Sequence, residues 1–399
     1  MEQWKEYKIS DIIEEIAMGP FGSNIKVDNF IDFGIPVLNG SNLQGFKLNE
    51  DSFNYVSEEK AESLGRANAF RGDVVITHRG TLGQIVYIPL DSKYEKYVIS
   101  QSQFRLKLNQ DLIRPDFLVY FFHTRIGQHR ILMNASQVGV PALARPTSTF
   151  KEVSIPVPPM EIQNKIMSIL LSLNNKIEIN RRINDNLEQQ AQLLFDNLID
   201  ASDWSTTQFL SELSEINPPR KLSKGEYAPF VEMSNMPTSG SFPSRIDYKE
   251  YNGGMKFRNG DTIMARITPC LENGKAAYVN FLKENEIGFG STEYIVLAPK
   301  KTISSSFLYF LVRNKEFVDY AVKHMNGSSG RQRVSGDTIG NYQLPILDRN
   351  KLSIFIAIAD RTLSKIRQNS FEILNLAKQR DTLLPKLMSG ELKINDLNC

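Results

Sequence analysis

The chain has 399 residues, an apolar fraction of 41% and a charged fraction of 23%, the composition of an ordinary soluble globular protein with about two domains. Its 47 basic and 45 acidic residues nearly balance, and residues 1–158 carry 17 basic and 18 acidic residues while residues 203–347 carry 17 and 15. Neither part is basic throughout, so any nucleic-acid contact must be local. The first residues lack the apolar core of a signal peptide, and no stretch has the ~18 apolar residues of a membrane span. The two cysteines form no motif. These features predict a cytoplasmic protein.

Residues 1–158 contain phrases that return in the same order in residues 203–347. FRGDVVITHR, which ends at Arg79, returns as FRNGDTIMAR, which ends at Arg266. The helix-like PDFLVYFFHT returns as SSFLYFLVRN, and the loop MNASQVGVPA returns as MNGSSGRQRV. Ordered repetition of this kind indicates that one structural unit is written twice. We therefore expect two similar globular domains of mixed helices and strands.

Residues 159–202 and 348–399 differ in kind from the repeated segments. In each, apolar residues recur at steps of three and four, which predicts a long helix; forty residues would extend roughly 60 Å. Leu384 and Pro385 are expected to stop or kink the second helix, because proline lacks the N–H and clashes with the preceding turn. Neither helix can bury its apolar surface alone. We expect an α+β fold in which they pair as an antiparallel coiled coil between two domains related by a pseudo-twofold axis; the alternative is that they only brace the domains.

The sequence carries no catalytic signature. Asn217-Pro218-Pro219 is followed by Arg220, where an amino-group methyltransferase needs an aromatic residue to stack on the flipped base, and is interpreted as a turn. No phosphate-binding loop is present, and the four histidines lack zinc-like spacing. The sequence therefore favours a non-catalytic recognition or scaffolding protein.

Three phrases, GPFGSNIK, PVPPMEIQNKI and LLPKLMSGEL, together with the globule–helix–globule–helix order, resemble the DNA-specificity subunit of Type I restriction–modification systems. The resemblance covers essentially the whole chain. It implies that residues 1–158 and 203–347 are target recognition domains, each reading one half of a split site in double-stranded DNA. It also implies that residues 159–202 and 348–399 are conserved spacer helices that dock two modification (methyltransferase) subunits.

The same resemblance places the chemistry on other chains. S-adenosylmethionine, ATP and Mg²⁺ are expected on the modification and restriction/translocase subunits, with no cofactor or metal on this chain and no membrane partner. Two other functions stay open at this point. One is a single-chain adenine methyltransferase with degenerate motifs, and the other is a coiled-coil adaptor that binds only proteins.

Base-reading residues are expected among polar and basic side chains on loops that rigid strands hold in place. In the first domain the candidates are Ser23, Asn24, Lys26, Asn39, Asn42, Arg79, Gln101, Gln103 and Gln137. In the second domain they are Ser234, Asn235, Arg266, Thr268, Lys275, Ser291, Thr292, Ser328, Arg331, Gln332 and Arg333.

Each group of candidates has a structural alternative. Arg79 and Arg266, taken as counterparts at the ends of the repeated strand, could instead pair with a carboxylate beside that strand. NGSNL could be only a strand-joining turn, and the loop GSSGRQR only a mobile surface loop. The aspartates that follow glycine, Asp73 and Asp261, are expected to form turns.

Overall fold

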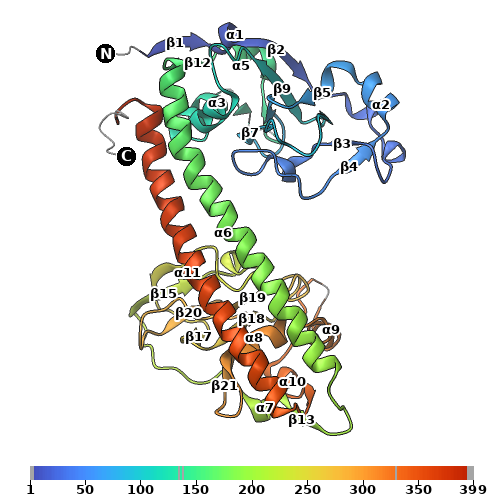
Figure 1. The fold of residues 1–399 in the computed structure, drawn as a ribbon, viewed down its shortest axis with the longest axis vertical. Coiled ribbons are helices and arrows are strands. Elements are labelled where there is room, and N and C mark those ends of the chain that lie inside the picture. Colours follow the sequence, from blue (N-terminus) through green and yellow to red (C-terminus); the bar gives the residue numbers. More distant parts are fainter. Residues whose placement is uncertain (1–3, 134, 137–138, 329, 393–399) are drawn as a thin grey trace. The chain divides into compact units, whose positions relative to one another are not determined.

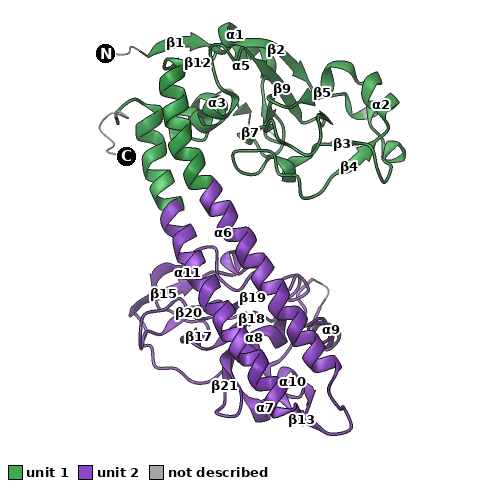
Figure 2. Ribbon diagram, viewed as in Figure 1, with its two compact units in different colours: residues 1–174, 377–399 green, residues 175–376 purple. Residues whose placement is uncertain are grey.

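The computed structural model describes residues 4–133, 135–136, 139–328 and 330–392. Its contacts divide the chain into two compact units, Met1–Asn174 with Ala377–Cys399 (unit 1) and Asn175–Leu376 (unit 2), which Figure 2 distinguishes by colour. Each unit contains one mixed globular part and a portion of each long helix, and unit 2 has the larger portion of both. The expected four-part division of the chain at its helix boundaries stays a prediction.

Two long helices, α6 (Met160–Asp200) and α11 (Arg349–Met388), form where the apolar period predicts them (Figure 1). α11 continues through Pro385 for three more residues, so of the expected stop or kink at this proline the stop is wrong, and the kink stays a prediction. Because Pro385 lies close to the end of the helix, its missing N–H removes only one backbone hydrogen bond. The flanking Leu384 and Leu387, 5% and 0% exposed, pack into the core. None of the described helices is long and apolar enough to cross a membrane.

α6 and α11 pack together within both units. In unit 1, Ile166 near the start of α6 shares a core with Leu387 near the end of α11. In unit 2, the ring of Phe195 near the end of α6 lies 5.5 Å from that of Phe355 near the start of α11. The start of each helix thus packs against the end of the other, which confirms the antiparallel pairing. The pseudo-twofold relation between the domains stays a prediction.

A polar seam interrupts the apolar contact of the two helices in unit 2. The Nδ2 of Asn369 donates to the Oδ1 of Asn184 across 2.8 Å, and the Nδ2 of Asn180 donates to Glu372 across 2.9 Å. Asn180 and Asn369 are both 2% exposed. Buried amides that satisfy each other penalise any sliding of one helix along the other, so this seam sets their register.

The globular part of unit 1 contains two four-stranded sheets. The first has the order β2-β9-β6-β7, with the bounds Ile13–Met18, Gln103–Leu108, Val74–Thr77 and Ile85–Tyr87. The second has the order β4-β3-β8-β5, with the bounds Asn54–Val56, Ile35–Val37, Lys96–Val98 and Asn68–Phe70. β3 and β8 pair in parallel, and all other neighbours in these sheets are antiparallel.

Unit 2 repeats this arrangement strand for strand. Its first sheet has the order β14-β21-β18-β19, with the bounds Ser214–Ile216, Tyr294–Pro299, Thr262–Ala265 and Ala276–Tyr278. Its second has the order β16-β15-β20-β17, with the bounds Asp247–Glu250, Tyr227–Val231, Gly288–Gly290 and Lys256–Phe257. Here too the second and third strands, β15 and β20, are the parallel pair. The internal repeat is therefore a duplication of the fold.

Several of the smaller elements also correspond between the units, among them the pairs β1–β12 and β13–β22. Unit 1 has the pair β1 (Lys5–Lys8) and β12 (Ser154–Val157), the two-stranded ribbon β10 (Ala135–Ser136) and β11 (Ala142–Leu143), and the helices α1 (Ile9–Ile12), α2 (Glu58–Ser63), α3 (Pro115–Phe122), α4 (Arg125–Leu132) and α5 (Pro146–Lys151). Unit 2 has the pair β13 (Thr207–Phe209) and β22 (Gln343–Pro345), and the helices α7 (Leu210–Leu213), α8 (Ser305–Arg313), α9 (Lys315–Lys323) and α10 (Gly336–Gly340). Single 3₁₀ turns are η1 (Gly22–Asn24), η2 (Val27–Asn29), η3 (Gly40–Leu43) and η4 (Gly65–Ala67) in unit 1, and η5 (Met233–Asn235) in unit 2.

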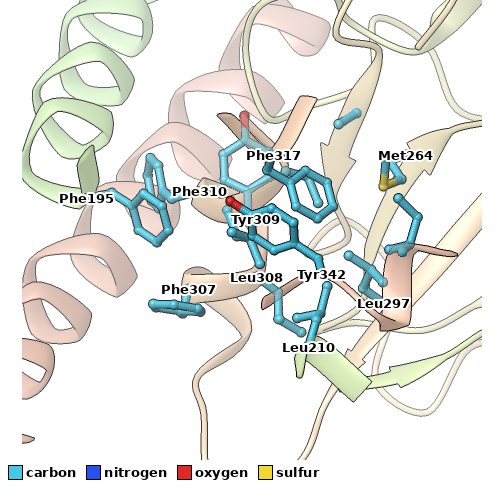
Figure 3. Close-up of a cluster of buried hydrophobic side chains, with 14 of the residues drawn as sticks. Phe195, Leu210, Met264, Leu297, Phe307, Leu308, Tyr309, Phe310, Phe317 and Tyr342 are labelled. Atoms are coloured by element: carbon cyan, nitrogen blue, oxygen red, sulfur yellow. The ribbon is translucent and has the colours of Figure 1, made fainter. Parts of the chain in front are cut away.

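Aromatic side chains of α8 join the globular part of unit 2 to α6 (Figure 3). The rings of Phe195 and Phe307 lie edge to face at 5.1 Å, and Tyr309 and Phe310 are 0% exposed. In unit 1, Phe121 and Phe122 of α3 are equally buried. These aromatic residues therefore belong to the core and are not free to stack on a nucleic-acid base.

Both Gly-Asp turns of the repeated phrase form as expected, and each also holds a buried arginine. Asp73 accepts a hydrogen bond from the amide of Phe70 at 3.0 Å, and Asp261 accepts one from the amide of Arg258 at 2.9 Å. Asp261 also accepts from Nη2 of Arg220 at 2.7 Å. The side chain of Arg220, the residue that replaces the aromatic of a methyltransferase motif, is thus used inside the domain and is only 10% exposed.

Candidate nucleic-acid interface

In unit 2, three predicted segments meet at one edge of the β14-β21-β18-β19 sheet. They are the residues that follow β18, the connection from β20 to β21, and the loop between α9 and α10. The amide of Arg266 donates to the carbonyl of Glu293 at 3.0 Å, and the amide of Val334 donates to the carbonyl of Arg266 at 3.0 Å. The amide of Thr268 donates to Gln332 at 3.1 Å. The fold therefore collects polar side chains that the sequence separates by up to about seventy residues.

An arginine–glutamate cluster, formed by Arg266, Glu293 and Arg333, lies at this meeting point. Nε of Arg333 donates to both carboxylate oxygens of Glu293 at 2.9 Å, and its Nη2 donates to Oε1 at 2.7 Å. Nε of Arg266 lies 4.0 Å from the same carboxylate. The hydrogen bonds from Arg333 to Glu293 raise the pKa of the guanidinium. For Arg266 the structure shows the carboxylate pairing that the sequence left as an alternative.

Several other predicted residues brace the same edge. The Oγ1 of Thr268 accepts a hydrogen bond from the amide of Gln332 at 3.1 Å, and the Oγ of Ser291 accepts one from the amide of Glu293 at 3.1 Å. Thr292, Ser328 and Arg331 are exposed beside them. The edge thus has a hydrogen-bonded frame and an exposed outer layer of polar groups.

Unit 1 builds the corresponding edge with the same backbone contacts. The amide of His78 donates to the carbonyl of Ser102 at 2.8 Å, and the amide of Leu143 donates to the carbonyl of His78 at 2.8 Å. The amide of Gly80 donates to Pro141 at 2.8 Å. The predicted Arg79 and Gln101 are exposed here.

These contacts show that Arg79 and Arg266 are not counterparts, so this part of the sequence comparison is wrong by one residue. His78 makes the two backbone hydrogen bonds that Arg266 makes in unit 2, and the β-bridge of Arg79 to Ala142 corresponds to that of Ile267 to Arg333. The second phrase has one residue fewer between its Gly-Asp turn and its final arginine. Because successive side chains of an extended chain point to opposite sides, the offset changes what each arginine faces.

Two of the predicted readers are buried framework residues. Asn42 is 1% exposed, and its amide nitrogen donates to the carbonyls of Asn49 and Ser52 at 2.9 and 3.0 Å. Gln103 is 0% exposed, and its Oε1 accepts from the amide of Ser100 at 2.9 Å. Such side chains hold loops in place, and neither is accessible to a base edge.

The exposed residues among those predicted to read bases in unit 1 lie on neighbouring turns. Asn24, Lys26 and Asn39 are exposed. The turn that holds Asn24 lies against the sheet edge that carries Gln101. Gly22 in this turn is so close to Gln101 that an added Cβ would come within 2.2 Å of its Oε1. Of Ser23 the backbone alone is described, and Gln137 lies outside the described residues.

Lys275 supports a turn in unit 2. Its Nζ donates to the carbonyl of Met233 at 2.7 Å, the first residue of η5, which also carries Ser234 and Asn235. In unit 1 the Nε2 of Gln84 donates to the carbonyl of Gly40, the first residue of η3, at 3.2 Å. Ser234 is exposed, Asn235 is half-buried, and Lys275 holds the turn that presents them.

Glu293 belongs to the arginine–glutamate cluster but is not among the residues predicted from the sequence. It directly follows the predicted Thr292, and the expected alternative for Arg266 was a carboxylate beside its strand. An acidic residue next to predicted contact residues was the available signal.

Comparisons with known proteins agree with the duplicated fold. The profile of a family described as "Type I restriction modification DNA specificity domain" matches residues 1–189 and 202–351. The chain is 26% identical to the Type I restriction enzyme MjaIX specificity subunit of Methanocaldococcus jannaschii, over 99% of this chain and 95% of that protein. It is 21% identical to the Type I restriction enzyme HindI specificity subunit of Haemophilus influenzae, over 98% and 100% of the two chains.

A solved structure has the same fold. The S subunit of a Type I restriction–modification system from M. genitalium matches with a TM-score of 0.56 at 17% identity, covering 96% of each chain.

Proposed function

Because the chain belongs to the family of Type I restriction–modification DNA specificity proteins, we propose that it reads a bipartite DNA site, with the globular part of each unit bound to one half-site. The role of the chain in such a system is sequence specificity and not catalysis. The observation that carries the proposal is that the two units have the same backbone hydrogen bonds at corresponding sheet edges but different side chains there. Where unit 2 has Arg266, Glu293 and Arg333, unit 1 has His78, Ser102 and Ala142 at the corresponding backbone positions.

This difference has a direct physical consequence. Bases are distinguished by the pattern of donors and acceptors on their major-groove edges, so two edges that carry different side chains at corresponding positions favour different bases. The shared strands, in turn, keep both edges rigid enough for such reading. A duplicated fold with unlike edges therefore suits a site whose two halves differ in sequence.

The two long helices are proposed to space the reading domains and to dock other subunits. In unit 2 these helices expose apolar side chains that their mutual packing leaves uncovered, among them Ile179 at 51%, Leu193 at 62% and Ile354 at 63%. A partner that packs along these helices would cover such side chains and remove their apolar surface from water. The proposed partners are two modification subunits, with restriction/translocase subunits joining the complex.

We further propose that S-adenosylmethionine, ATP and Mg²⁺ act on those partner subunits and that this chain binds none of them. A single-chain methyltransferase is disfavoured, because Arg220 replaces the stacking aromatic and is paired with Asp261. A protein-only adaptor would leave the two polar edges without a ligand. The cytoplasmic location stays a prediction.

A domain exchange tests the proposal. Residues 203–347 would be replaced by the corresponding segment of a related specificity subunit, and adenine methylation would be mapped across the genome of cells that carry either version. We expect one half of the methylated site to change and the other half to stay the same. An unchanged site would contradict the reading role, and S-adenosylmethionine binding by the isolated chain would support the methyltransferase instead. No DNA binding with the partner subunits present would favour the adaptor.

A further inference from the structure

We propose that Arg333, positioned by Glu293, reads a guanine in the half-site bound by unit 2. The inference rests on the proposed function and names the chemistry of one contact within it. Glu293 acts here as a positioning residue, since it is expected to touch the DNA only through the guanidinium that it holds.

The hydrogen bonds of Arg333 leave one specific edge of its guanidinium free. A guanidinium has five N–H donors. Nε and Nη2 each donate to Glu293, and Nη1 donates to the carbonyl of Arg331 at 3.0 Å. Among the residues that the structure describes, none accepts from the remaining N–H on Nη1 and the remaining N–H on Nη2. With the side chain 40% exposed, this pair can face a ligand.

Guanine is the base whose major-groove edge matches two adjacent donors. It offers two acceptors, N7 and O6, whereas adenine offers one acceptor beside a donor, and cytosine offers a donor. A second donor placed against the amino group of adenine would be unpaired. The free edge of Arg333 therefore selects guanine.

Glu293 also makes a phosphate an unfavourable ligand for this arginine. The Glu293 carboxylate, 2.7 Å from Nη2, offsets part of the positive charge that Arg333 and Arg266 present to a phosphate, and its own charge repels the phosphate. The edge of guanine is uncharged and does not meet this repulsion. The carboxylate thus directs Arg333 towards bases and away from the backbone of any DNA.

The backbone around the cluster supplies the rigidity that this reading needs. The amide of Arg333 donates to the carbonyl of Asn326 at 2.9 Å, and the amide of Asn326 donates to the carbonyl of Arg333 at 2.9 Å. The amide of Glu293 is held by Ser291 at 3.1 Å. Because the backbones of both Arg333 and Glu293 are held by hydrogen bonds, the two free N–H groups of Arg333 lose little conformational freedom on binding DNA.

Modified bases provide the test. Methylation mapping would first give the site, and the domain exchange would assign one half of it to unit 2. Each guanine of that half would then be replaced singly by 7-deazaguanine, which lacks the N7 acceptor. We expect one replacement to weaken binding of the full chain, with its partner subunits, by about tenfold or more. The same replacement should change binding by Arg333→Ala about twofold or less.

A second variant separates positioning from a merely structural role. Glu293→Gln keeps the shape but removes the charge, so it should bind unrelated duplex DNA as tightly as the parent or more tightly, while losing discrimination at that one guanine. The other half-site is the internal control and should be read unchanged. A purely structural role would instead lower the melting temperature and weaken all binding together.

Two results would overturn the inference. One is a unit 2 half-site without guanine, and the other is an equal response of parent and Arg333→Ala to every 7-deazaguanine. Failure of the proposed function has a different signature: no methylated site would depend on this chain, or the domain exchange would leave the site unchanged.

Discussion

Arg105 donates from Nη1 to the Oδ2 of Asp73 at 3.2 Å, and both side chains are only 4% exposed. Glu15 shares the same guanidinium, accepting from its Nη2 at 2.8 Å. Burial outweighs the attraction to Arg105 and raises the pKa of Asp73 to about 6. This buried network includes the Gly-Asp turn that starts the repeated strand of unit 1. Its ionisation state therefore affects the stability of the sheet that carries the proposed DNA-contacting residues.

The pH dependence of unit 1 stability should therefore contain a contribution from Asp73. Its carboxyl group titrates near pH 4 when unfolded and near 6 when folded. The stabilisation by its proton is complete below about pH 4 and is lost as the pH rises through about 6. Relative to Asp73→Asn, the free energy of unfolding of the parent should fall by up to about 3 kcal/mol across this window.

Urea unfolding at several pH values would measure this difference. Trp4 fluorescence in a Trp204→Phe background would report on unit 1, since Trp4 packs beside Phe117 there. Parallel pH profiles of parent and Asp73→Asn would show that Asp73 ionises at its ordinary pH.

Substitutions of two asparagines in one turn should have different effects, one mainly on stability and the other mainly on DNA binding. Asn42→Ala leaves the carbonyls of Asn49 and Ser52 without their donor, which should cost about 1–3 kcal/mol. Asn39→Ala, at an exposed position of the same turn, should cost less than Asn42→Ala and weaken binding of the unit 1 half-site. Thermal unfolding and competition binding would measure the two effects. A larger loss of stability for Asn39→Ala would contradict this assignment.

Arg331 should contact phosphate and not a base. It is exposed, and among the residues that the structure describes no carboxylate pairs with it. Arg331→Ala should weaken specific and unrelated DNA alike and reduce the slope of log K against log salt by about 1. The double variant with Arg333→Ala should also lose specific binding. Equal binding by parent and variants at every salt concentration would exclude this loop from the interface.

Substitutions of two neighbouring residues of α11 should affect different properties, one the packing of the long helices and the other the binding of partner subunits. Phe355 is 4% exposed and packs on Phe195, so Phe355→Ala should destabilise unit 2 by about 3–5 kcal/mol. Ile354 is 63% exposed, so Ile354→Ala should hardly change stability and should weaken assembly with the modification subunits. Calorimetry and size-exclusion chromatography of the mixed subunits would measure these effects. Normal assembly by Ile354→Ala together with Ile179→Ala would exclude this face as a docking surface.

Much of the architecture could be predicted because it depends on local patterns. Apolar residues at helical spacing predicted α6 and α11, and the ordered return of whole phrases predicted a duplicated fold. The aromatic residues of α3 and α8 could be assigned to the core for the same reason. Pro385 was misjudged, because its cost depends on how close it lies to the helix end and on the packing around it.

The two sheet edges proposed to contact DNA could be predicted only in part. The sequence alone determined which loops carry polar and basic groups, and the structure brings the predicted segments of each unit together. Tertiary structure alone decided which of those groups face outward: Asn39 and Asn42 belong to one short phrase, yet one is exposed and the other is buried by residues that follow it. It also decided that His78, and not Arg79, matches Arg266, and that Glu293 faces Arg333. The physical reason is that a single-residue offset reverses the side to which an extended chain directs a side chain, and that partners are chosen by contacts between segments distant in the sequence.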